Sequence, residues 1–191
     1  VRSALSEVCM RSYCRLSNVL DPTHNGGQLP RGLVSAATGT SGGAHNRNIS
    51  NIAGASYLAG AQCSMSAPLG PIKIADGVED VASRASALLA MTEKALEHFQ
   101  VVVACEFLVA CSAIECLKVT SSCDPAKLEP KGMVKTVLAN MPPSHLVAYS
   151  TEGQVFSLAS FKDSFFDAVN GLGLFDGFFQ AGRQQQPSSK L

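Results

Sequence analysis

The sequence predicts an all-α protein built as a bundle of long helices. Residues 78–119 contain neither glycine nor proline, so one uninterrupted helix of roughly 60 Å can form there at 1.5 Å per residue. Elsewhere apolar residues recur at steps of three and four, whereas no two segments alternate as paired strands do. The 191 residues suffice for one ordinary domain or for part of a larger one.

The first predicted helix covers residues 3–20 and ends at Asp21-Pro22, because proline disfavours helical backbone at the residue before it. Its apolar residues recur at helical spacing: Leu5, Val8, Cys9, Leu16, Val19 and Leu20. Residues 23–47 are predicted to be a loop, since their glycine clusters permit backbone angles closed to other residues. Such a long loop inside a compact domain is often functional.

Residues 48–65 are predicted to be a helix of small residues, which must pack tightly because glycine lowers helix propensity by up to about 1 kcal/mol. A flexible loop is the alternative. Residues 67–77 are a second predicted loop, at whose end Asp76 can cap the following helix.

The long helix, 78–119, changes character along its length. Its first half is amphipathic, whereas residues 101–117 are apolar on nearly every face and require neighbouring helices all round. Charged residues make up only 16% of the chain, against about 25% in a typical protein. Both observations predict a partner or a second copy; an unusually buried single domain is the alternative.

The remainder is broken by prolines. Short helices are predicted at 133–140 and at 160–169, the latter with Phe161, Phe165 and Phe166 on one side. The polar tail, 184–191, is predicted to be disordered. The expected organisation is therefore a helical core over 1–120, a helical and loop region over 121–183, and the tail.

Composition argues against several functions. A formal net charge of zero disfavours nucleic-acid binding. The most apolar stretch, 101–114, contains Glu106 and is shorter than the ~20 residues of a membrane span, so no membrane partner is expected. The seven cysteines form no CxxC pair and no zinc-type cluster with histidine, so we expect free thiols in a reducing compartment and no metal site.

Two carboxylate positions are candidates for chemistry. Glu79-Asp80 lies at the predicted start of a helix, where it could complement the helix dipole or, beside an apolar wall, act as an acid or base. Glu106 within the apolar run needs a partner such as Arg15, Lys94 or a residue of a neighbouring subunit, and a structural ion pair is the simpler interpretation. Thr40-Ser41-Gly42-Gly43 could form a phosphate nest but lacks the lysine of a P-loop, so a flexible loop is favoured.

The chain ends in Ser189-Lys190-Leu191, the form of a receptor-read peroxisomal import signal. This ending predicts a peroxisomal or glycosomal protein with the import receptor as a partner. A chance ending is the alternative, and it predicts a cytoplasmic protein.

Several motifs together resemble the C-terminal half of the histidine/phenylalanine ammonia-lyase and aminomutase family. They are Ala4-Leu5-Ser6-Glu7, Arg15-Leu16 with Val19-Leu20-Asp21-Pro22, Gly27-Gln28-Leu29-Pro30, Ala55-Ser56-Tyr57 with Gln62, Val78-Glu79-Asp80-Val81 with Ser83, and Glu106-Phe107-Leu108-Val109-Ala110-Cys111 with Ala113-Ile114-Glu115. The resemblance covers residues 1–118 and implies an all-helical tetramer with a central bundle of long core helices.

The resemblance also implies an activity. These lyases use a methylidene-imidazolone electrophile made from an Ala-Ser-Gly triplet, and they release ammonia from an amino acid or move its amine. That triplet is missing here, so the electrophile is expected from an upstream segment or a paralogous chain. Thr40-Ser41-Gly42 lies at another motif and is rejected as its source.

Glu79 carries over as the residue that handles the substrate amine and protons. Gly60 and Leu117 depart from the family pattern, which normally has a glutamate and an arginine there. The chain begins at Val1, so we expect a trimmed, processed or partial chain that is inactive alone. The alternative is a non-catalytic helical scaffold or regulatory subunit that associates with an active paralogue.

Overall fold

The computed structural model describes residues 2–34, 39–65, 85–120, 129, 131–140 and 157–171. These residues form helices and turns with no strand among them, which confirms the predicted all-α class. The chain divides into two compact units, 1–122 and 123–191, which are described separately below.

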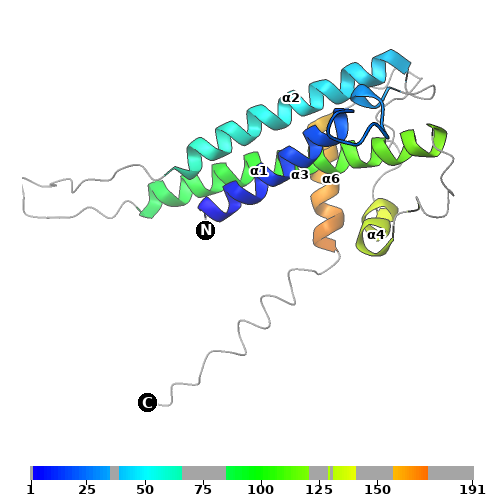
Figure 1. Cartoon of the computed structure of the whole chain (residues 1–191). Coiled ribbons are helices and arrows are strands. Elements are labelled where there is room, and N and C mark those ends of the chain that lie inside the picture. The colour runs from blue at the N-terminus through cyan, green and yellow to red at the C-terminus, as the bar shows by residue number, and fades with distance from the viewer. Residues whose placement is uncertain are drawn as a thin grey trace, which may run out of the picture. The chain divides into compact units, whose positions relative to one another are not determined.

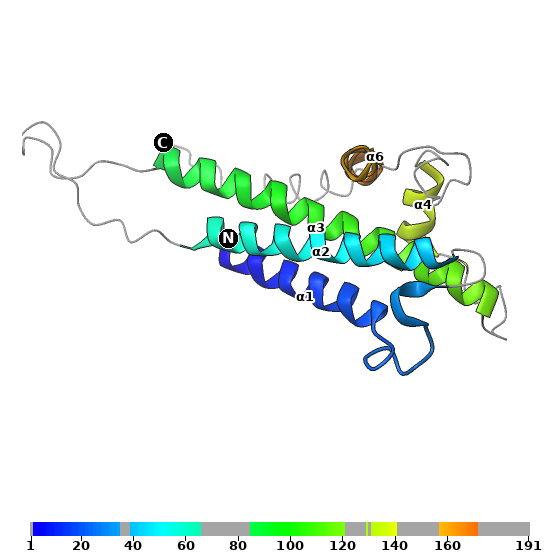
Figure 2. The same ribbon diagram turned by 90° about the horizontal axis from the view of Figure 1, so that it is seen from above.

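Three long helices make up the first unit: α1 (Arg2–Leu20), α2 (Gly39–Ser64) and α3 (Ala85–Thr120). Figures 1 and 2 show them side by side, with α2 running opposite to α1 and α3, and each helix contacts the other two. A short 3-10 helix, η1 (Arg31–Leu33), lies on the connection from α1 to α2. The buried side chains of this unit range in size from alanine to phenylalanine, and they include Cys9, Leu16, Ile49, Ala53, Ala95, Phe99, Val102 and Cys105.

The helix α2 begins nine residues before the predicted start at Asn48. The prediction of loop for residues 39–47 is therefore wrong. Packing explains the difference, because Asn46 and Ile49 are buried and the Asn46 side-chain amide donates to the Gly32 carbonyl oxygen at 3.1 Å. These contacts offset the poor helix propensity of the glycines in the first two turns.

The backbone at η1 is unusual, because Leu33 adopts a φ of 60° directly after Gly32, whose φ is 65°. A branched residue rarely occupies this region, and its cost must be balanced elsewhere. The Leu33 side chain is completely buried, so burial of its apolar surface offsets the strain.

The second unit contains α4 (Gly132–Asn140) and α6 (Leu158–Gly171), as predicted from the sequence. Phe161 and Phe165 lie one helical turn apart on α6 with stacked rings, 6.4 Å between centroids, and both are buried. Phe166 meets Phe165 edge-on at 5.0 Å. The phenylalanines predicted to share one side of this helix therefore form a continuous aromatic cluster.

By length and composition alone, one helix of the described chain, Ala87–Val119 within α3, could cross a membrane. The buried core helix of a soluble protein passes the same test, so this is weak evidence for a span. Glu106 lies within the stretch and forms an ion pair, an arrangement that is expensive in a bilayer.

Candidate functional site

The site residues predicted from the sequence lie outside the described residues. Glu79 belongs to the connection between α2 and α3, and Ser189, Lys190 and Leu191 belong to the C-terminal tail. The structure does describe the two helix ends from which the Glu79 connection leaves: Ser64 at the end of α2 and Ala85 at the start of α3.

An apolar cluster lies close to these two helix ends. Cys9, Ala95 and Phe99 are buried there, and partly buried Leu5, Tyr57 and Cys63 pack against them. The Arg2 guanidinium donates to the Cys63 carbonyl oxygen at 3.3 Å, which ties the beginning of α1 to the last turns of α2. All three helices therefore contribute to this cluster.

Gly60, where the ammonia-lyase pattern has a glutamate, lies against α3. A Cβ atom at this position would lie 2.5 Å from Cε1 and 2.8 Å from Cδ1 of Phe99, and 3.2 Å from Cβ of His98. Carbon atoms do not approach so closely, so α2 and α3 can pack as they do only with glycine at residue 60. The Phe99 ring takes the space that a side chain at residue 60 needs.

A polar cluster between α1 and α3 contains Glu106. Its carboxylate receives two bonds from the Arg15 guanidinium, from Nε at 2.5 Å and from Nη2 at 3.0 Å, and a further bond from the Ser12 hydroxyl. The Glu106 side chain is 24% exposed and Arg15 is 61% exposed. The hydrogen bond to Glu106 raises the pKa of Arg15 above its usual value.

Of the partners that the sequence left open for Glu106, the structure shows Arg15. Both carboxylate oxygens of Glu106 already accept hydrogen bonds, and two parallel bonds to one guanidinium fix the orientation of the carboxylate. Glu106 therefore has a structural role, as an ion pair that joins α1 to α3.

The six cysteines in the described residues are free thiols. Burial raises the pKa of Cys105 to about 12, and burial together with the Glu106 charge raises that of Cys9 to about 11. Burial, then the Glu115 charge, raises the pKa of Cys111 to about 11. Because the thiolate is the reactive form, these three are packing residues and not nucleophiles. Among the described residues, no three potential metal ligands gather.

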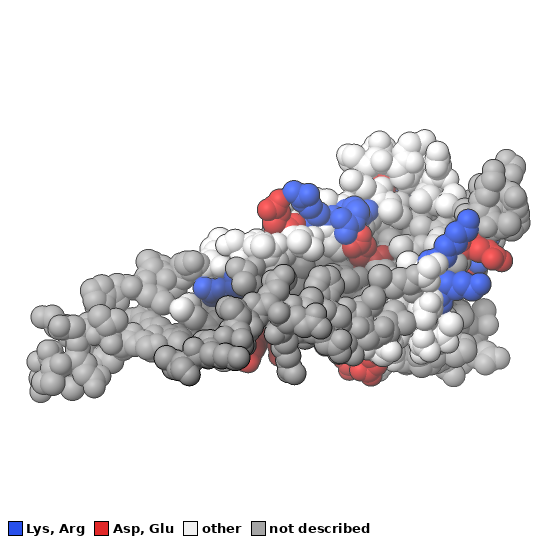
Figure 3. Space-filling view, turned by 90° about the horizontal axis from the view of Figure 1, so that it is seen from below, with Lys and Arg blue, Asp and Glu red and all other residues white. Residues whose placement is uncertain are grey.

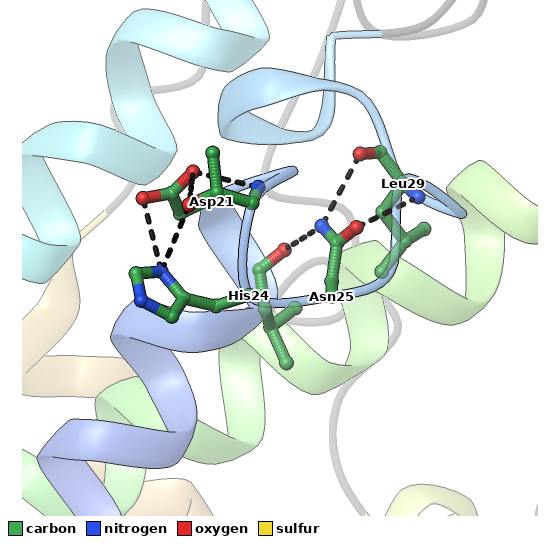
Figure 4. A network of polar contacts seen from close by, with 6 residues as sticks. Asp21, His24, Asn25 and Leu29 are labelled. Carbon is green, nitrogen blue, oxygen red and sulfur yellow. Dashed lines mark hydrogen bonds and ion pairs between the residues drawn. The ribbon is translucent and has the colours of Figure 1, made fainter.

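A hydrogen-bonded turn follows α1 (Figure 4). Asp21 Oδ1 accepts bonds from the Thr23 amide at 3.0 Å and the Thr23 hydroxyl at 2.9 Å, and His24 Nδ1 lies 3.1 Å from Asp21 Oδ2. The Thr23 bonds, and to a lesser extent His24, lower the pKa of Asp21. The Asn25 amide bonds to the Val19 and Leu29 carbonyls. These hydrogen bonds fix the conformation of the turn, and the lowered pKa favours the ionised form of Asp21.

A pocket of about 260 Å³ lies beside this turn in the first unit. It is formed by the end of α1 and the turn that follows it, by η1 and by the third and fourth turns of α2. Its lining residues are Ser17, Leu20, Asp21, Arg31, Gly32, Arg47, Ser50 and Asn51. Sequence reasoning missed this site. Residues 23–47 were predicted to be a loop, and nothing in that pattern indicates that Arg31 and Arg47 line one pocket.

A second pocket, of about 390 Å³, lies in the second unit, and among its described lining residues only Asp167 is ionisable. On the face shown in Figure 3, Lys and Arg side chains mostly lie beside Asp and Glu, so neither sign of charge dominates the coloured atoms. The pocket in the first unit, by contrast, is lined by two arginines and one aspartate.

The described chain defines a helical protein whose three long helices pack around an apolar core, with a partly buried Arg15–Glu106 ion pair joining α1 to α3. A family model, aromatic amino acid lyase, matches residues 1–137. The chain belongs to the aromatic amino acid lyase family. No curated protein and no solved structure matches it significantly.

Proposed function

We propose that the chain is the C-terminal portion of a diverged amino-acid ammonia-lyase, a carbon–nitrogen lyase of the histidine and phenylalanine type or a related aminomutase. The family match over residues 1–137 carries this proposal. The order of the motifs supports it, because the segments around Asp21-Pro22, Tyr57, Glu79 and Glu106 follow the family's sequence of helices and connections.

The methylidene-imidazolone group does not fit as a product of this chain. None of the 191 residues forms an Ala-Ser-Gly triplet, and Thr40-Ser41-Gly42 belongs to the first turns of α2. We therefore assign that electrophile, which activates the substrate amine, to an upstream segment or a paralogous chain. In this proposal the 191 residues alone have no lyase activity.

Glu79 is the residue that this chain contributes to the reaction. Its carboxylate would hold the substrate ammonium and take up or return a proton there, as a glutamate beside an apolar wall can. Its place in the connection between α2 and α3 suits this role, because loops carried by a rigid helical base often hold functional residues.

The test is reconstitution. The chain alone, and the chain co-expressed with an upstream segment that contains Ala-Ser-Gly, are assayed for unsaturated-acid absorbance with histidine, phenylalanine and tyrosine. We expect activity only in the second case, a loss of at least about 100-fold in kcat for Glu79→Gln, and little effect of Asp80→Asn as a matched control. Turnover by the chain alone, or equal effects of both variants, contradicts the proposal.

One observation favours a second function, that of a non-catalytic scaffold or regulatory subunit. At residue 60 the pattern's glutamate is replaced by glycine, and Phe99 fills the space. A chain that has lost this side chain and supplies no electrophile can still stabilise an active paralogue. Purification of the chain with its natural partners decides between the two: an Ala-Ser-Gly segment in the same polypeptide supports the lyase, and one only in a separate, independently active paralogue supports the subunit.

We also propose import into peroxisomes or glycosomes through Ser189-Lys190-Leu191, with the import receptor as a partner. A receptor must reach the terminal carboxylate, and residues 184–191 have no apolar residue before Leu191 that could anchor them. A fluorescent protein carrying residues 184–191 is expected in punctate organelles, and removal of Leu191 is expected to return it to the cytosol. Diffuse signal from the intact tail refutes targeting.

A further inference from the structure

The pocket beside the turn after α1 brings together three charged residues from three elements. Arg31 comes from η1, Arg47 from α2 and Asp21 from the turn that directly follows α1. They are distant in sequence, and only the antiparallel packing of α1 and α2 around η1 makes them neighbours of one cavity.

The two arginines bring uncompensated charge to this pocket. Across the part of the chain that the structure describes, neither Arg31 nor Arg47 forms an ion pair, whereas Arg11 and Arg15 each pair with a glutamate. Asp21 lies in the same pocket, but its oxygens bond to Thr23 and His24 and it is not within ion-pair distance of either arginine. The two guanidinium groups and the Asp21 carboxylate thus line the same cavity without pairing with one another.

The backbone around the charges is held in place. The buried Asn46 side chain donates to the Gly32 carbonyl, which fixes η1 against α2, and Leu33 is completely buried next to it. The Asp21 turn is fixed by the bonds to Thr23 and by those of Asn25. A site with pre-positioned groups loses less conformational entropy when a ligand binds.

We propose that this pocket binds the zwitterion of a free amino acid, with its carboxylate between Arg31 and Arg47 and its ammonium toward Asp21. Guanidinium groups recognise carboxylates through paired hydrogen bonds. The volume of about 260 Å³ lies just below the range of about 300–1,000 Å³ for drug-sized ligands, so it suits a small molecule.

The charge pattern discriminates against other anions. A phosphate dianion would gain from both arginines but would meet the Asp21 carboxylate, which stays ionised because its pKa is lowered. A simple carboxylate such as acetate meets the same repulsion and has no ammonium to compensate.

Amino-acid binding at this pocket needs neither the electrophile nor Glu79. The binding experiment can therefore succeed or fail independently of the proposed lyase function.

Ligand-observed NMR titration of the 191-residue chain tests this site, with alanine, acetate, ethylammonium and inorganic phosphate as probes. Alanine is expected to bind most tightly, in the millimolar range, because the groups are solvent-exposed, and to bind more weakly as salt is raised. Arg31→Gln and Arg47→Gln are each expected to weaken alanine binding by about tenfold, through loss of charge-assisted hydrogen bonds. Arg11→Gln, an exposed arginine outside the pocket, is the matched control.

Asp21→Asn gives the sharpest outcome, because its effects on two probes have opposite signs. Removing the carboxylate is expected to weaken alanine binding and to strengthen acetate binding, with circular dichroism confirming that the turn variant remains folded. The proposal is overturned if alanine shows no saturable binding, if phosphate or acetate binds as tightly as alanine, or if the arginine variants bind alanine like the Arg11 control.

Discussion

Gly60 shows how a single missing side chain can determine the approach of two helices. In sequence it is only a departure from a family pattern, and its neighbours, Ala59 and Ala61, suggest nothing more than small size. The structure adds the reason, because the Phe99 ring lies where a Cβ atom would have to be. The identity of the residue at 60 is therefore set by α3, almost forty residues further along the chain.

We predict that Gly60→Ala destabilises the first unit by about 1–2 kcal/mol. Overpacking typically costs about 1–3 kcal/mol, and the better helix propensity of alanine returns up to about 1 kcal/mol. Gly54→Ala is the matched control, since its Cβ would meet the flexible end of Tyr13 at 3.0 Å and that ring can move. Urea unfolding measures both variants, and equal midpoints for the two would contradict the prediction.

Burial of Cys105 makes the stability of the fold depend on pH. Its thiol has a pKa of about 12 in the folded chain, against 9.0 for the ordinary value. Above pH 9 the unfolded chain releases this proton and the folded chain does not, so stability is fully present below pH 9 and is lost as the pH rises towards 12.

From pH 8 to pH 10 we expect Cys105 to account for a loss of about 1.4 kcal/mol in the free energy of unfolding. Burial also raises the pKa values of Cys9 and Cys111, which contribute over the same interval, so the comparison is with Cys105→Ala under reducing conditions. The variant should lose less stability over the same interval. An identical loss in both proteins would show that the thiol does not contribute.

At the scale of elements, helices could be predicted from the sequence where apolar periodicity and helix propensity agree. Helices were predicted at residues 3–20, 133–140 and 160–169, and the structure has them at 2–20, 132–140 and 158–171. The need of Glu106 for a partner was also predicted, because a carboxylate in an apolar run is costly when unpaired, but the sequence did not choose between Arg15, Lys94 and a neighbouring subunit. The pocket lined by Arg31, Arg47 and Asp21 and the early start of α2 could not be predicted from the sequence, because both depend on contacts with η1.

A proline substitution tests whether α2 begins at Gly39, as in the structure, or at Asn48, as predicted from the sequence. Asn48 is exposed in the tenth position of the helix, so Asn48→Pro is expected to cost about 3 kcal/mol by removing a hydrogen bond and by its ring clashing with the preceding turn. If the helix began at residue 48, as the sequence alone predicts, proline would be tolerated in the first turn. Urea unfolding with Asn48→Ala as control separates the two cases, and unchanged stability of the proline variant supports the later start.

At the scale of the whole molecule, the three-helix unit covers only part of its own apolar surface. The second half of α3 buries residues such as Val102, Leu108 and Val109, so a neighbouring subunit is not needed for those. Large apolar side chains remain exposed elsewhere on all three helices, namely Val8, Met10, Ile52, Leu58, Met65, Leu89, Leu96 and Val119. Assembly into a tetramer through a helical bundle stays a prediction.

Leu89 and Leu96 offer the test of assembly, because they lie seven residues apart on one face of α3 and are 60% and 41% exposed. We expect the chain to form an oligomer in light scattering and the Leu89→Lys/Leu96→Lys double variant to form a smaller species. Ala87→Lys, an exposed position two residues from Leu89, is the control for added charge. A stable monomer at micromolar concentration contradicts the prediction.

The contact between Tyr13 of α1 and Tyr57 of α2 has a spectroscopic consequence. Their rings are stacked with centroids 6.0 Å apart and an angle of 7° between planes, and the chain has no tryptophan and only one further tyrosine. Near-ultraviolet circular dichroism at tyrosine wavelengths is therefore expected to be dominated by this pair. The chain carries a built-in optical reporter for the docking of its first two helices, readable without any label, and Tyr13→Phe should abolish most of the signal while far-ultraviolet helicity stays the same.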